Sequence, residues 1–272
     1  MFSQSELDAM RALVTRCRAE LLPHFSNSPA VMQPTAPFGT VAAPADYDGT
    51  NAAHFLDLTN LKPQSTGDDI AALCKKAIEL GCPTVCINPT MLAVAQSNLS
   101  RSAVKAICVV GFPLGCSTAA AIAAETRLAV QAGAAEVDMV LSPGMMKAKL
   151  YNMAYEQITT VVAAAGKVPV KVILETCKLT DEEVVKASLI AAAAGAAFVK
   201  TSTGFSMDKL DDQPHTGATP QRVALMRLAV GDAVGVKASG GIKTAADADA
   251  VLKAGANRLG ASGLQLDAGA SY

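Results

Sequence analysis

The spacing of hydrophobic and polar residues changes near residue 53. From there to about residue 260, short apolar and β-branched runs alternate with longer Ala-rich stretches of helical periodicity. The short runs predict eight strands, centred near Phe55, Val85, Ile107, Val137, Val172, Phe198, Val234 and Leu259. The longer stretches predict helices over 66–80, 89–98, 117–132, 151–166, 180–194, 219–230 and 244–254.

This alternation predicts an α/β fold in which parallel strands are joined by helices. Eight units between residues 55 and 259 leave about 29 residues for each unit, which favours a closed (β/α)8 TIM barrel over an open doubly wound sheet. A GxGxxG motif does not follow the first strand, and the sequence contains no P-loop. Both absences weaken the nucleotide-binding alternatives.

The first 50 residues follow a different pattern. Ser3 and Glu6 fit a capping box, and apolar residues recur at helical spacing with arginines elsewhere on the wheel, so residues 1–24 predict an N-terminal amphipathic helix. Four prolines between residues 25 and 50 predict a loop or extended arm. We therefore expect a helix and arm over 1–50 and a barrel domain over 51–272. The helix could cover one end of the barrel or form a subunit contact.

Composition and charge narrow the function. The chain has 272 residues, of which 51% are hydrophobic and 17% charged, so it can build a large core and is not disordered throughout. A net charge of -1 argues against nucleic acid or an acidic membrane as the main partner. The longest apolar stretches are too short to span a bilayer, and the N-terminus resembles neither a secretory signal nor a transit peptide.

The cysteines point to a reducing compartment. There are seven, and none forms a CxxC pair. Cys82 and Cys86 form a lone CxxxC without a nearby His, so we predict no zinc or other metal site. Unpaired cysteines in apolar surroundings are typical of cytoplasmic proteins.

Two lysines at the ends of apolar strands are the first candidates for chemistry, because barrel active sites lie at the carboxyl ends of the strands. Lys200 follows eleven uncharged residues, 189–199. Desolvation lowers the pKa of an amine and favours its nucleophilic free base. Lys237 ends the next strand, and a second cation would lower the pKa of Lys200 further. Either lysine could instead reach solvent from a strand end.

Several other charged or polar residues interrupt the strands. Asp138 lies in an apolar run, where it needs a partner and could relay a proton or pair with a lysine. Lys171 is also inside an apolar run, and its role is open. Glu136 is nearer the strand start and is expected to be solvated at the bottom of the barrel. Asp57 and Thr59 end the first strand, where they could face the mouth or cap a turn.

A set of small residues follows strands six to eight: Gly204, Gly240, Gly241, Gly260 and Ser262. Loops after the last strands of such barrels commonly bind phosphate through backbone N–H groups. Lys243 could add positive charge there. The glycines could alternatively serve only the tight turns, and Cys86, at another strand end, is interpreted as a buried structural thiol.

These residues belong to strings that together resemble the deoxyribose-phosphate aldolases, the class I aldolases of deoxynucleoside catabolism. The strings include Leu-Asp-Leu-Thr at 56–59, Val-Cys-Ile-Asn-Pro at 85–89, Glu-Val-Asp at 136–138, Lys-Thr-Ser-Thr-Gly at 200–204 and Lys-Ala-Ser-Gly-Gly at 237–241. Others occur at 111–115, 125–127 and 174–176. The strings occur in family order and at barrel spacing over residues 54–263.

The resemblance implies reversible cleavage of 2-deoxy-D-ribose 5-phosphate to D-glyceraldehyde 3-phosphate and acetaldehyde, without a cofactor. It implies that Lys200 forms the Schiff base, that Lys237 tunes its amine and that Asp138 takes part in proton transfer. The five small residues above, with Asp57 and Thr59, would then contact substrate or its phosphate. A phosphosugar partner and a homo-oligomer are expected.

The carboxyl end departs from the family pattern. Some members have a mobile tail ending in Tyr that assists the proton step, and Tyr272 would be its counterpart. Only ten residues follow Ser262, so a terminal helix is expected to be reduced or absent. Phe205 and Gly263 stand where some members have Lys and Ser, which weakens the expected phosphate site.

Two other functions remain open. A phosphosugar isomerase or epimerase would use a carboxylate or His base and would not need two strand-end lysines. A catalytically weak barrel could serve as a scaffold through its N-terminal helix. Only the aldolase hypothesis predicts an imine on Lys200.

Overall fold

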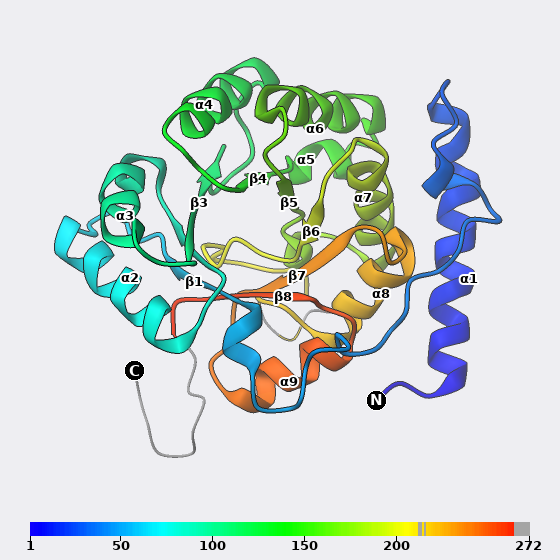
Figure 1. Cartoon of the computed structure of the whole chain (residues 1–272). Helices are drawn as coiled ribbons and strands as arrows, with labels where there is room; N and C mark the ends of the chain where they lie inside the picture. Colours follow the sequence, from blue (N-terminus) through cyan, green and yellow to red (C-terminus); the bar gives the residue numbers. More distant parts are fainter. Residues whose placement is uncertain (212–213, 215, 264–272) are drawn as a thin grey trace.

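Eight parallel strands close into a barrel in chain order in the computed structural model, which describes residues 1–211, 214 and 216–263 (Figure 1). The strands are β1 (Leu56–Asn60), β2 (Thr84–Ile87), β3 (Lys105–Val110), β4 (Val137–Val140), β5 (Val170–Ile173), β6 (Phe198–Lys200), β7 (Gly235–Ser239) and β8 (Arg258–Ala261). Pairing of β8 with β1 closes the barrel. The predicted TIM barrel is therefore confirmed, although Phe55 and Val234 lie one residue before their strands.

Helices surround the strands (Figure 1). They are α2 (Gly67–Leu80), α3 (Leu92–Leu99), α4 (Ala119–Gln131), α5 (Pro143–Lys147), α6 (Tyr151–Ala165), α7 (Asp181–Ala193), α8 (Pro220–Val230) and α9 (Ala245–Lys253). All but α5 coincide with predicted helices. The short α5 begins at Pro143, a residue favoured in the first turn of a helix.

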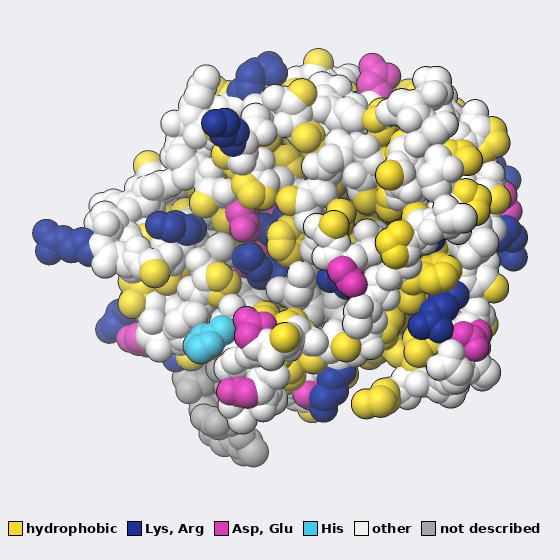
Figure 2. Space-filling view, turned by 45° about the vertical axis from the view of Figure 1, so that its right-hand side comes forward, with side chains coloured by type: hydrophobic (Ala, Val, Ile, Leu, Met, Phe, Trp, Pro, Cys, Tyr) yellow, Lys and Arg dark blue, Asp and Glu magenta, His cyan; other side chains and the backbone are white. Residues whose placement is uncertain are grey.

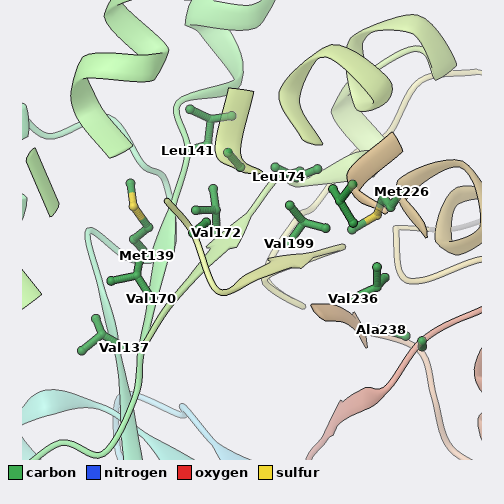
Figure 3. Packing of buried hydrophobic residues seen from close by; sticks show 14 of the residues in the cluster. Val137, Met139, Leu141, Val170, Val172, Leu174, Val199, Met226, Val236 and Ala238 are labelled. Atoms are coloured by element: carbon green, nitrogen blue, oxygen red, sulfur yellow. The ribbon is translucent and has the colours of Figure 1, made fainter. Parts of the chain in front are cut away.

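Alternation along each strand separates two sets of side chains. Val137 and Met139 of β4, with Val170 and Val172 of β5, lie in the apolar layer between strands and helices, which also includes Met226 of α8 (Figure 3). Because successive side chains of a strand point to opposite faces, the residues between them point into the barrel. A separate interior cluster contains Cys86, Ile107 and Val109, whereas β4 to β8 and β1 supply charged side chains to the interior.

The N-terminal segment lies against the outside of the barrel. Helix α1 (Gln4–Leu21) starts at the predicted Ser3–Glu6 capping box and packs on α7 and α8. The arm contains a 3-10 turn at Ala30–Met32 and is held by contacts such as Thr40 Oγ1 to Asp232, 2.8 Å. One arginine of α1 belongs to the buried face: Arg18 is fully buried and donates to Ala36 O, Pro37 O and Ala229 O.

Replacing Arg18 with Met is expected to destabilise the protein by about 2–4 kcal/mol and to expose the arm. The change leaves three carbonyl oxygens without their charged donor, of which that of Ala229 is buried, and hydrogen bonds of this type contribute about 1.5–3 kcal/mol each when intact. Urea unfolding and limited proteolysis within residues 25–50 would measure both effects. Arg16→Met is the matched control, because the Arg16 side chain is 58% exposed. Equal behaviour of the two variants would contradict the anchoring role.

The surface carries charges of both signs. On the face shown in Figure 2, basic and acidic side chains are interspersed, with a small group of both near its centre. Within the described part of the chain, no helix is both long and apolar enough to cross a membrane. All seven cysteines are free thiols, and only Cys116 is exposed.

Candidate active site

Lys200 and Lys237 occupy paired positions on β6 and β7. Both converge on one carboxylate: Asp138 Oδ2 is 2.9 Å from Lys200 Nζ and 2.8 Å from Lys237 Nζ. Asp138 and Lys237 are fully buried, and Lys200 is 3% exposed. The structure thus brings together the three residues that the sequence singled out, because β4, β6 and β7 point alternate side chains into the same barrel interior.

The electrostatic surroundings separate the two lysines. Burial lowers the pKa of Lys200 and, with the charge of Lys237, outweighs the opposing effect of Asp138. Burial also acts against the charged form of Lys237, but Asp138 and Asp57 together raise its pKa above the usual value. For Asp138, burial alone would raise the pKa, and Lys171, Lys200 and Lys237 reverse the direction and hold it well below its usual range. The site therefore shifts Lys200 toward its free amine, and shifts Lys237 and Asp138 toward their charged forms.

Asp57 and Lys171 are both fully buried inside the barrel. Asp57, which could face the mouth or cap a turn, was expected from the resemblance to contact substrate, but it is fully buried, accepts from Thr84 Oγ1 at 2.7 Å and pairs with Lys237 and Arg258. That expectation is corrected, because Asp57 lies near the start of β1, opposite Thr84, the first residue of β2. The carboxyl ends of these strands, which form the mouth, lie further along the chain. Lys171 Nζ is 2.8 Å from Asp138 Oδ1.

Glu136 was expected to be solvated at the bottom of the barrel, but its side chain is only 16% exposed. It forms an ion pair with Lys171 and lies 3.6 Å from Arg258. Arg258 was missed altogether, although its place at the start of an apolar strand was a usable signal. Cys86 is the buried thiol that was expected, and burial raises its pKa.

A cavity of about 420 Å³ opens above Lys200, and Lys200 lines it. The lining includes the residues expected to contact substrate, Thr59, Gly204, Gly240, Gly241, Gly260 and Ser262. The cavity is also lined by Lys243, Lys62, Asn60, Thr203 and Ser239. Of these, the sequence analysis missed Lys62 and Asn60, and it noted Thr203 and Ser239 only within family strings. Tyr272 and the expected reduction of the terminal helix lie outside the described residues. Among those described, no group of three His, Cys, Asp or Glu side chains could hold a metal ion.

Gly260 makes room for the lysine pair. An added Cβ at this position would lie 3.0 Å from Lys237 Cε and 2.9 Å from Ser239 Cβ. Gly240, in contrast, has a left-handed φ of 84° that favours glycine by itself. Gly260 is therefore needed because Ser239 Cβ and the Lys237 side chain both pass close over it.

We expect Gly260→Ala to lower kcat/KM by about 10- to 100-fold. The free energy of unfolding should fall by only about 1–3 kcal/mol, the usual cost of overpacking. The methyl group would press on Lys237 Cε and Ser239 Cβ, and a shift of the lysine side chain would weaken its contact with Asp138. Steady-state kinetics with urea unfolding would separate the two effects. Gly67→Ala is a useful control, since Gly67 lies in the first turn of α2 and the nearest atom to its added Cβ is Val94 Cγ1 at 3.9 Å. Unchanged kinetics in Gly260→Ala would contradict this account of Lys237 placement.

Glu175 supports the loop that follows β6. It is buried, adopts a left-handed φ of 55°, and accepts hydrogen bonds from the backbone N (3.3 Å) and Oγ1 of Thr203. Burial raises the pKa of Glu175. Thr203 lies between Lys200 and Gly204. Through these hydrogen bonds the strained Glu175 therefore holds the segment that connects Lys200 to Gly204, which lines the cavity. The sequence analysis noted Glu175 only within a family string.

Comparison with protein families matches residues 51–270 to the DeoC/LacD family aldolase model. The chain belongs to the DeoC/LacD aldolase family. A deoxyribose-phosphate aldolase of Clostridium perfringens (strain SM101 / Type A) is 49% identical over 216 residues, which are 79% of this chain and 93% of the relative. Another, from Macrococcus caseolyticus (strain JCSC5402), is 49% identical over 217 residues, 79% and 95% of the two chains. The family resemblance found in the sequence is confirmed.

Solved structures of the family agree with the fold. A Coccidioides immitis protein thought to be a deoxyribose-phosphate aldolase superimposes with a TM-score of 0.77 and 34% identity over 94% of each chain. The tetrameric deoxyribose phosphate aldolase of Aeropyrum pernix gives 0.69 and 30%, over 79% of this chain and 88% of that one. The first match leaves 6% of this chain uncovered, so it must include part of the N-terminal segment that precedes the family match.

Proposed function

We propose that the protein is a class I deoxyribose-phosphate aldolase, which reversibly cleaves 2-deoxy-D-ribose 5-phosphate to D-glyceraldehyde 3-phosphate and acetaldehyde. The observation that carries this proposal is a lysine amine of lowered pKa at the floor of a cavity, 2.9 Å from an ionised aspartate. A free amine at that place can attack a carbonyl carbon. Family membership and the 49% identical deoxyribose-phosphate aldolases support the substrate.

In this mechanism Lys200 Nζ attacks the C1 aldehyde, and loss of water leaves an iminium. A base takes the proton from the C3 hydroxyl as the C2–C3 bond breaks, and the bond electrons pass into the iminium to form an enamine. The C3 aldehyde leaves as the three-carbon product. Protonation of the enamine and hydrolysis of the imine release the two-carbon acetaldehyde and regenerate Lys200. Asp138 fits the proton-transfer role through a water, and Lys237 keeps Lys200 from holding a proton.

The phosphate group is proposed to lie against the loops after β6, β7 and β8. Gly204, Gly240 and Gly241 have left-handed φ angles of 82°, 84° and 77° in these loops, and all three line the cavity. Such conformations can turn backbone N–H groups toward an anion. Lys62 and Lys243 line the same cavity and can supply positive charge. They could replace the lysine that some family members have at the position of Phe205.

The surroundings of the enzyme follow from the same proposal. We expect a phosphosugar substrate, no nucleic acid partner, and a homo-oligomer, as the tetrameric relative from Aeropyrum pernix suggests. A cytoplasmic location is supported by the free thiols. The division into 1–50 and 51–272, and the participation of Tyr272, stay predictions.

Borohydride trapping tests the proposed function. The protein is incubated with acetaldehyde and sodium borohydride, and its peptides are mapped by mass spectrometry. A reduced two-carbon adduct on Lys200 is expected, with cleavage of deoxyribose 5-phosphate in a parallel assay. If the folded protein forms no adduct and does not cleave the sugar phosphate, the proposal is overturned.

A further inference from the structure

Seven charged side chains form one connected cluster inside the barrel. Its members are Asp57, Glu136, Asp138, Lys171, Lys200, Lys237 and Arg258, supplied by the strands from β4 around to β1 or by the residue before β4. Only Lys200 lines the cavity. The part nearest the bottom of the barrel, at Glu136 and Arg258, has side chains that are 16% and 17% exposed.

The cluster is unbalanced when every member is charged. Lys171, Lys200, Lys237 and Arg258 are four potential cations, whereas Asp57, Glu136 and Asp138 are three carboxylates. A neutral Lys200 brings the sum to zero. Because buried charge is costly unless it is compensated, the cluster reaches balance by releasing one proton, and Lys200 is the member next to the cavity.

Ion pairs within the cluster connect each deep residue to Lys200 through Asp138. Asp138 joins the two ends: its Oδ2 accepts from Lys200 and Lys237, and its Oδ1 accepts from Lys171. Lys171 in turn pairs with Glu136 and lies 3.8 Å from Asp57. Lys171 thus fixes the carboxylate that faces Lys200 and also adds positive charge beneath it.

We propose that Lys171 and the carboxylates beneath it, Glu136 and Asp57, are positioning residues that set the protonation state of Lys200 through the summed charge of the closed barrel interior. This inference deepens the proposed function, and it rests on Lys200 being the reacting amine. In this arrangement the Lys237 cation is one contributor among several. Residues that never touch the substrate determine the pH at which the enzyme works.

Other titratable groups also face Lys200. Asp138 reaches it from β4, Lys237 from β7 and the Cys86 thiol from β2, and Glu175 lies after β5. Cys86 and Glu175 have no ion pair with the cluster among the described contacts, and burial raises the pKa of both. Lys105, at the start of β3, is exposed to solvent. All of these groups stay unchanged in the variants below, so differences between variants report the deep residues alone.

The test measures the acid-side midpoint of kcat/KM against pH in the full chain. Glu136→Gln and Asp57→Asn each remove a negative charge, which disfavours protonated Lys200, so the midpoint should move to lower pH by roughly one unit. Lys171→Met removes a positive charge and should move it to higher pH by a similar amount. Combining Lys171→Met with Glu136→Gln restores the charge sum, and the midpoint should return toward that of the unaltered protein.

A second readout does not depend on turnover. The pH dependence of Lys200 modification by an amine-selective imidoester, followed by peptide mass mapping, reports its free-base fraction in each variant, and circular dichroism confirms folding. Glu136→Gln should perturb folding least of these variants, because the Glu136 side chain is partly exposed. If the midpoints of the folded variants do not move, or move in the same direction for charges of opposite sign, the inference is overturned. If unaltered protein forms no borohydride adduct, the proposed function fails instead.

Discussion

Lys200→Met is expected to lower kcat/KM for deoxyribose 5-phosphate by at least about 10⁴-fold, within the range seen when an enzyme loses its nucleophile. Methionine has a similar length but no amine, so neither the imine nor the enamine can form. Borohydride with acetaldehyde should then leave the 198–205 peptide unmodified. Removal of the amine also leaves three cations opposite three carboxylates, so the cluster stays balanced and the variant should fold.

The control for this experiment is Lys167→Met. Lys167 is exposed between α6 and β5, outside the barrel. It should keep full activity and the adduct on Lys200. Residual turnover in Lys200→Met above about 1% of the unaltered rate, with the variant folded, would show that the reaction does not proceed through this amine. An adduct on Lys237 in the variant would show that Lys237 can form the Schiff base, and it would contradict the assignment of this role to Lys200.

Asp138→Asn is expected to cost both stability and turnover. Breaking a buried ion pair from one side destabilises a protein by about 3–5 kcal/mol, and here the carboxylate serves three lysines at 2.8, 2.8 and 2.9 Å. The neutral amide cannot take a proton, so kcat should also fall by about 10²- to 10⁴-fold, the usual contribution of a general acid or base. Urea unfolding and steady-state kinetics on the folded variant measure the two effects.

The labelling of this variant separates catalysis from structure. Asparagine leaves Lys200 without its anionic partner, which favours the free amine, so a borohydride adduct should still form on Lys200 although turnover is lost. Asp46→Asn, at an exposed position in the arm, is the matched control and should be unaffected. A folded Asp138→Asn variant with normal kcat would remove Asp138 from the proton step and leave it only an electrostatic role.

The candidate site was predictable where local sequence carries the signal. A charged residue inside an apolar strand is costly unless it is partnered, so Lys200, Lys237 and Asp138 stood out from their neighbours. The positions of the two lysines at the ends of neighbouring strands also indicated that they could meet at the barrel mouth. Glu175 and Ser239 had no comparable signal, because one supports a loop through hydrogen bonds and the other lines the cavity as an ordinary small polar residue.

Depth within the barrel was harder to predict. Asp57 and Thr59 are two residues apart and point into the same interior, yet only Thr59 lines the cavity. The register between strands bears on this: Asp57 lies opposite Thr84, the first residue of β2, which does not line the cavity. A two-residue step along a strand moves a side chain by about 6–7 Å, enough to separate a buried ion pair from a substrate contact.

The sequence by itself determined the alternation of strands and helices, the closed eight-unit barrel, the family, and the lysine and aspartate positions that break the apolar pattern. These depend on the periodicity of neighbouring residues, which is local. Only the tertiary structure decided how the charges combine. Asp57 and Arg258 are 201 residues apart and meet because β8 closes on β1. Closure removes their side chains from water together, and that shared burial makes the cluster respond as one set of charges.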